Sequence, residues 1–186
     1  MKLSEIKQTI GTVATVTGDD DVEIRYLLTD SRQLGAEPEK TLFFALKTEK
    51  NDGAKYIPEL QAKGVRAFVT GDALAALQLL AAHIRSRFNG TVIGITGSNG
   101  KTVVKEWLYQ LLKEDYTIIR SPKSYNSQIG VPLSVWQLAD ADRPADSKTV
   151  SLTDRLRLKD LSWQSSKPES RNPGRWRNWS GSFVRR

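Results

Sequence analysis

The sequence predicts an α/β protein in which a small N-terminal domain precedes the incomplete start of a parallel sheet and a disordered tail. Three observations support this prediction. Short apolar strands alternate with helical stretches through the first 120 residues. Residues 92–104 read VIGITGSNGKTVV, a strand followed by a glycine-rich turn and a helix start. After Leu138 the composition changes and apolar residues become scarce.

Residues 1–88 contain the pattern of a small α/β domain. Leu3–Ile10 should form a short helix, because its apolar residues share one side and Gly11 follows it. Residues 18–21 (GDDD) separate two expected strands and predict a solvated hairpin turn. The remaining expected elements are strands at 12–17, 23–29, 41–46 and 66–70, and helices at 54–63 and 72–88. A domain boundary is expected near Asn89 and Gly90.

The 92–104 stretch predicts a phosphate-binding loop. Glycines let backbone N–H groups approach phosphate oxygens, and a helix N-terminus adds partial positive charge. Lys101 would reach the β- and γ-phosphates as the catalytic residue, and the Thr102 hydroxyl would hold Mg²⁺. The nucleotide-binding residues would be Gly97, Ser98, Asn99, Gly100, Lys101, Thr102 and Val103. The strict phosphate-loop pattern needs glycine where this chain has Ile95, and the alternative is a turn that binds nothing.

The helix after this loop is expected to run from Thr102 to about Glu114. Its core face is predicted from Val104, Leu108, Leu111 and Leu112. Trp107 is expected to pack against the protein rather than to stack on a base.

Three motifs carry a resemblance to a known family. TGSNGKT at 96–102 resembles the ATP loop of the Mur ligases, cytoplasmic enzymes that build the peptide of peptidoglycan. DSR at 30–32, followed by TLFFAL at 41–46, resembles the uridine-nucleotide-binding domain of the MurE and MurF types. Asn126, Gly130, Val131 and Pro132 resemble the MurF-type segment in which an asparagine precedes G-x-P-L, where MurE-type ligases carry Thr-Thr-Pro.

The resemblance implies an ATP-dependent amide-bond ligase that uses Mg²⁺. Such an enzyme adds D-Ala-D-Ala to UDP-MurNAc-tripeptide through an acyl phosphate, and some relatives are fused to an alanine racemase. By the same resemblance, residues 1–88 would be a UDP-substrate-binding domain, and 89–138 part of a P-loop ATPase-type central domain. The chain would then be a truncated and inactive ligase fragment, since a MurF-type ligase is at least about twice as long.

The substrate-binding residues implied by the resemblance are Ser31, Arg32, Asn51, Asp52 and Asn126. A short polar set at a strand end can also bind an anion on its own chemistry. From the residues alone, a capped turn is the favoured interpretation of 30–32, whereas 47–56 fits a turn before a helix and a substrate loop equally. Ala54 stands where the family often has histidine.

Composition excludes several classes of protein. There is no cysteine, so disulfides and thiolate metal sites are excluded, and His83 is the single histidine. The N-terminus has no apolar signal core, and no apolar run approaches membrane-spanning length. The expectation is a cytoplasmic protein without a membrane partner.

Residues 139–186 form a basic tail that is expected to be disordered. They hold 11 of the 28 Lys and Arg residues, and three of the five tryptophans. We hypothesise an out-of-frame continuation of a ligase gene, which the coding DNA would test. Two other functions stay open: a nucleic-acid-binding protein with a basic, aromatic tail, and a UDP-sugar or nucleotide-binding module without catalysis.

Overall fold

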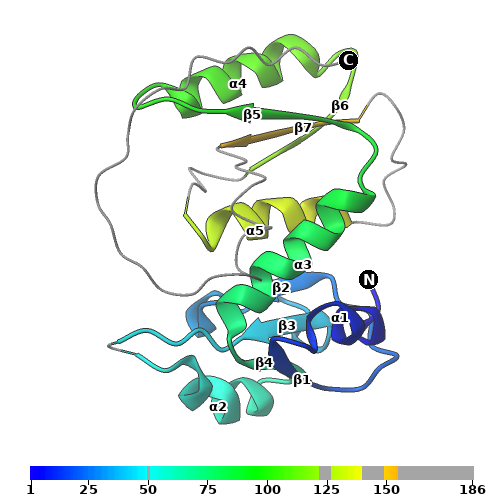
Figure 1. Cartoon of the computed structure of the whole chain (residues 1–186), viewed down its shortest axis with the longest axis vertical. Helices are drawn as coiled ribbons and strands as arrows, with labels where there is room; N and C mark the ends of the chain where they lie inside the picture. Colours follow the sequence, from blue (N-terminus) through cyan, green and yellow to red (C-terminus); the bar gives the residue numbers. More distant parts are fainter. Residues whose placement is uncertain (50, 122–126, 140–148, 155–186) are drawn as a thin grey trace.

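The computed structural model describes residues 1–49, 51–121, 127–139 and 149–154, arranged around two sheets (Figure 1). Within these residues a four-stranded N-terminal sheet has the order β1-β4-β3-β2, and a three-stranded second sheet has the order β5-β7-β6. None of the helices in these ranges is long and apolar enough to cross a bilayer.

The strands are β1 (Ala14–Thr17), β2 (Tyr26–Leu28), β3 (Thr41–Phe44), β4 (Ala67–Gly71), β5 (Thr91–Ile95), β6 (Thr117–Arg120) and β7 (Thr149–Asp154). The α-helices are α1 (Leu3–Ile10), α2 (Ile57–Ala62), α3 (Ala73–Arg87), α4 (Lys101–Leu112) and α5 (Gly130–Trp136). Short 3₁₀ turns are η1 (Ser31–Gln33), η2 (Pro38–Lys40), η3 (Gly53–Tyr56) and η4 (Gln137–Ala139).

The N-terminal sheet is covered on both faces. Alternate residues of a strand point to opposite faces, and every residue of β3 is buried. Leu42 and Phe44 pack in the cluster that includes α1 and α3. Phe43 packs in the cluster of the opposite face, edge-on against Phe68 with 6.5 Å between ring centroids. The continuous apolar run of β3 therefore reflects a parallel strand covered on both faces.

The hairpin expected at residues 18–21 does not form. β1 pairs antiparallel with β4, and β2 pairs parallel with β3, so the two strands lie at opposite edges of the sheet. The connecting turn is held against α1 instead, where Lys7 Nζ donates to the Gly18 carbonyl at 2.8 Å and to Asp20 at 2.5 Å. Only Ala14 is fully buried in β1, which suits an edge strand.

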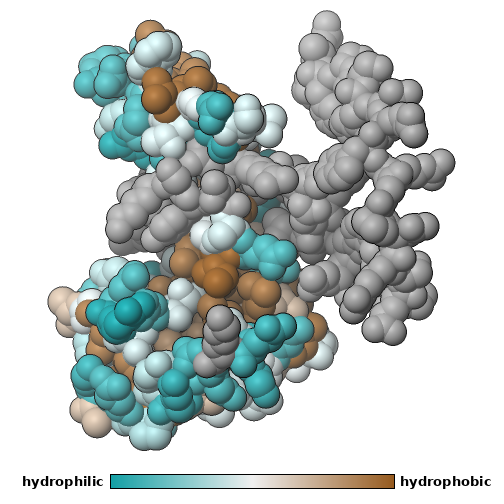
Figure 2. Space-filling view, turned by 90° about the vertical axis from the view of Figure 1, so that its left-hand side faces the viewer, coloured by the Kyte–Doolittle hydropathy of each residue, from teal (hydrophilic) through white to brown (hydrophobic). Residues whose placement is uncertain are grey.

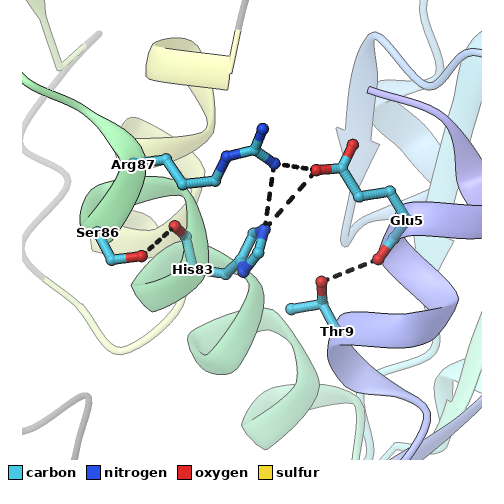
Figure 3. Close-up of polar contacts among 5 residues, drawn as sticks. All are labelled: Glu5, Thr9, His83, Ser86 and Arg87. Carbon is cyan, nitrogen blue, oxygen red and sulfur yellow. Dashed lines mark hydrogen bonds and ion pairs between the residues drawn. The ribbon is translucent and has the colours of Figure 1, made fainter.

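α1 and α3 are also joined by a polar cluster around Glu5 (Figure 3). Arg87 forms an ion pair with Glu5, and His83 Nε2 lies 3.8 Å from the same carboxylate. Ser86 Oγ donates to the His83 carbonyl at 2.7 Å, and Thr9 Oγ1 donates to the Glu5 carbonyl at 2.9 Å. The single histidine thus contributes to helix packing.

The regular fold continues past Leu138, which corrects the expectation that residues 139–186 are wholly disordered. Residues 149–154 form β7, the strand between β5 and β6, parallel to both. Val150 and Leu152 are buried in it. Composition averaged over the last 48 residues concealed a six-residue strand of alternating Thr/Ser and apolar residues. The rest of the predicted tail, 140–148 and 155–186, lies outside the described residues.

α4 packs on the second sheet with a different face from the one predicted. Lys105 is buried, whereas Val104 is 43% exposed, Leu111 74% and Trp107 64%. Apolar side chains reach the surface at the end of the molecule that carries α4 (Figure 2). The predictions that Val104 and Leu111 face the core and that Trp107 packs were therefore wrong, whereas Leu108 and Leu112 of the predicted face are half-buried.

α5 lies on the opposite side of the second sheet from α4, beside α3 (Figure 1). Its residues Val135 and Trp136 belong to the same buried cluster as α1 and α3. The Trp136 indole Nε1 donates to the Arg25 carbonyl at 2.8 Å, across 111 residues of sequence. α5 therefore connects the second sheet to the N-terminal unit.

We predict that Leu152→Ala lowers the free energy of unfolding by about 2–5 kcal/mol, because it opens a cavity at a fully buried position. Leu111→Ala, at an exposed position, should change it by less than about 0.5 kcal/mol. Urea titration of the full chain measures both values. Equal changes in the free energy of unfolding for the two variants would contradict the central position of β7.

Candidate functional site

The connection from β5 to α4 forms a glycine-rich loop at the carboxyl edge of the second sheet. Ile95, the last residue of β5, is buried and anchors the start of the loop. Gly97 has φ +148° and Gly100 has φ +77°, values that residues with a side chain rarely adopt. Gly100 caps α4, so the helix begins directly at Lys101. The strand, turn and helix predicted from the sequence are thus confirmed.

The Lys101 side chain folds back over this loop. Its Nζ donates to the Gly97 carbonyl at 2.7 Å and to the Ser98 carbonyl at 3.3 Å. Residues 96–100 and Thr102 are exposed, and a Cβ added at Gly100 would meet nothing within 4 Å. The Lys101 ammonium and the N-terminus of α4 therefore lie at an open surface. Such a surface can accept an anion.

The structure brings all the residues predicted for this loop into one loop–helix junction: Gly97, Ser98, Asn99, Gly100, Lys101, Thr102 and Val103.

A second set of predicted residues lies at the carboxyl ends of β2 and β3. Ser31 and Arg32 are in η1, directly after β2. Asp30 caps this turn by accepting from the Arg32 amide at 3.1 Å. The Arg32 guanidinium also donates to both Asp30 oxygens, at 2.9 Å from Nε and 2.6 Å from Nη2. The turn is therefore capped, and Arg32 already has a carboxylate partner although its side chain is 86% exposed.

The Arg32–Asp30 pair changes the acidity of the aspartate. Hydrogen bonds from the Arg32 side chain, and then from its amide, lower the pKa of Asp30 from 3.8 to about 2. This pair contributes to stability above about pH 3.8, and the contribution is lost as the pH falls through about 2.

Asn51 and Asp52 follow β3 at the neighbouring strand end. The Asn51 carbonyl accepts from the Thr48 amide at 2.8 Å, and Asp52 Oδ1 accepts from the Ala54 amide at 2.9 Å, which caps η3. Leu34, after η1, and Tyr56, in η3, pack against the same apolar cluster. The two polar sets therefore border the same face of the N-terminal sheet. Asn126 lies outside the described residues.

Three residues with evident roles were not selected from the sequence. Asp30 was part of the DSR motif, and an aspartate two residues before an arginine is a common capping arrangement. Lys105 is buried, and Trp136 bonds to a distant carbonyl. Neither of these two roles has a local pattern, because both depend on the packing of segments far apart in sequence.

Comparison with known proteins agrees with this geometry. Residues 95–145, which begin at the end of β5 and contain the loop, match the model of the Mur ligase middle domain. Over these residues the chain is similar to the Mur ligases. The resemblance stated from the sequence is thereby confirmed.

The Mur ligase relatives are of the MurF type. The chain is 34% identical over 136 residues to the UDP-N-acetylmuramoyl-tripeptide–D-alanyl-D-alanine ligase of Synechocystis, covering 64% of this chain and 29% of that one. It is 30% identical over 161 residues to the ligase of the same name from Haemophilus influenzae, covering 77% and 35%. The chain therefore spans about a third of the length of these relatives.

Solved structures show the same fold. MurF from Acinetobacter baumannii superposes with a TM-score of 0.66 at 23% identity, covering 83% of this chain and 36% of that one. MurF ligase from Thermotoga maritima in complex with ADP gives a TM-score of 0.53 at 29% identity, covering 69% and 31%. The α/β fold predicted from the sequence is confirmed.

We predict that Arg32→Gln raises the pKa of Asp30 from about 2 towards 3.8, because the substitution removes the guanidinium that stabilises the carboxylate. Titration of the Asp30 carboxyl resonance by NMR measures this value. Arg66→Gln serves as a control at a different strand. An unchanged pKa in Arg32→Gln would show that Arg32 does not hold Asp30 in solution.

Proposed function

We propose that residues 97–103 bind the phosphates of ATP, and that the chain is the N-terminal third of a ligase joining D-Ala-D-Ala to UDP-MurNAc-tripeptide. The observation that carries the proposal is the loop itself. Two glycines with positive φ lead into α4, and the Lys101 ammonium donates to the Gly97 and Ser98 carbonyls. The names of the matched relatives and the ADP in the Thermotoga maritima structure support the choice of nucleotide and reaction.

In the proposed role, Lys101 Nζ gives up its hydrogen bonds to the loop carbonyls and donates to phosphate oxygens of the nucleotide instead. Its ammonium then offsets charge on the transferred phosphoryl group. Its Nζ already lies against the loop, 2.7 and 3.3 Å from two of the loop carbonyls, which supports this role. Catalysis by this group consists of positioning and charge neutralisation, and the protein supplies no nucleophile.

Thr102 would hold Mg²⁺ beside the phosphates. Its hydroxyl is carried by an exposed residue directly after Lys101, in the first turn of α4. A single protein oxygen suits Mg²⁺, which keeps several waters and is completed by nucleotide phosphates. When bound, Mg²⁺ supplies charge neutralisation for transfer of the γ-phosphate to the substrate carboxylate, and the amine of D-Ala-D-Ala then attacks the acyl phosphate.

Residues 1–88 would supply the site for the UDP-linked substrate. Ser31 and Arg32 after β2, with Asn51 and Asp52 after β3, border one face of the parallel part of the sheet. Ligands of such sheets bind outside the carboxyl ends of the strands. A substrate phosphate would have to compete with Asp30 for the Arg32 guanidinium.

Lys101→Ala should weaken ADP and ATP binding at least about 10-fold, because it removes a charged hydrogen-bond donor to phosphate. Titration calorimetry of the full chain measures the affinity. Lys113→Ala is the matched control, since Lys113 follows the last turn of the same helix. Unchanged affinity in Lys101→Ala, or no nucleotide binding by the unaltered chain, would overturn the proposal.

A second candidate is a nucleotide-binding module without catalysis. The observation behind it is the loop and its lysine, which would bind nucleotide phosphates whether or not a reaction follows. Purified protein given ATP, UDP-MurNAc-tripeptide and D-Ala-D-Ala separates the two. Release of phosphate that requires all three substrates supports the ligase, and nucleotide binding without turnover supports the module.

A further inference from the structure

α4 buries a charged side chain towards the second sheet and exposes apolar side chains to solvent. Lys105 is 1% exposed, although it lies only one turn after Lys101. An ammonium group withdrawn from water is costly unless hydrogen bonds and charges compensate it. The groups that compensate Lys105 therefore show where the helix is tied to the rest of the molecule.

Two of the contacts of Lys105 are with Ser121, directly after β6, and with Glu106, on α4 itself. Lys105 Nζ donates to the Ser121 carbonyl at 2.9 Å, and Glu106 Oε1 lies 3.8 Å from the same nitrogen. The Ser121 amide donates to the Leu152 carbonyl of β7 at 3.1 Å. Ser121 is thus held on both sides of its backbone, by the sheet through its amide and by α4 through its carbonyl.

This contact lies at the edge of the sheet that carries the phosphate-binding loop. β5, β7 and β6 are parallel, so the residue after β6 and the loop after β5 share the carboxyl edge. After Ser121 the chain leads to α5, whose first residue, Gly130, donates its amide to Ser127 Oγ at 2.9 Å. α5 in turn packs in the N-terminal core and is bonded there through Trp136.

We propose that Lys105 is a positioning residue that couples nucleotide binding at residues 97–103 to α5, and through α5 to the N-terminal unit. This inference rests on the proposed nucleotide site. Phosphate bound at the first turn of α4 would restrain that helix, and the Lys105 ammonium would transmit the restraint to the Ser121 carbonyl. The residue acts through the backbone of Ser121 and needs no contact with the nucleotide.

Hydrogen exchange of the full chain, with and without ADP, tests this coupling. In the unaltered chain, ADP should slow exchange of the α5 amides at least about threefold. Lys105→Met keeps the length of the side chain and removes the charge. This variant should bind ADP within about threefold of the unaltered affinity but lose the slowing in α5. Lys105→Arg should restore the slowing, and Lys113→Met is the control on the same helix.

The outcomes separate this inference from the proposed function. Unchanged α5 exchange when ADP binds the unaltered chain overturns the coupling alone, and so does slowing that persists in Lys105→Met. A purely structural lysine would lower the urea midpoint without removing the response of α5 to ADP. If circular dichroism shows that Lys105→Met does not fold, the coupling is judged from hydrogen exchange of α5 in the unaltered chain with and without ADP. Failure of the unaltered chain to bind ADP overturns the nucleotide site and the coupling together.

Discussion

The turn between β5 and α4 is the constraint on which the second half of the structure depends. The chain leaves β5 at the buried Ile95 and enters α4 after five intervening residues, through two glycines at positive φ. This path sets the first turn of α4 at the edge of the sheet and brings Lys101 over the loop. It also fixes the phase of the helix, which turns Lys105 inwards and Trp107 outwards.

The elements predicted from the sequence are those whose cause is local. The α1 helix, the glycine-rich loop before α4 and the short parallel strands each follow from a pattern within about ten residues. β7 was missed because its neighbours in space, β5 and β6, precede it by about 30 to 55 residues, and composition over a long window averages it away. The edge positions of β1 and β2 likewise depend on pairing partners that no local pattern specifies.

The candidate site, too, could be predicted from the sequence only in part. Residues 97–103 form one junction because the spacing of glycines and lysine dictates it. The Asp30–Arg32 pair shows that an exposed arginine in a family motif can already have a carboxylate partner, which the motif alone does not reveal. The roles of Lys105 and Trp136 required the fold, since each side chain bonds to a carbonyl far along the chain. These two contacts matter because the first ties the helix after the loop to β6 and the second ties α5 to the N-terminal unit.

The central claim is that the tail of a nucleotide lies in the loop at 97–103. The most direct test follows the amide resonances of the ¹⁵N-labelled full chain during titration with ADP and, separately, with AMP. The account predicts that the amides of residues 97–103 shift together with ADP, following one dissociation constant, and that AMP shifts them far less. Equal shifts with both nucleotides, or shifts confined to other residues, would contradict it.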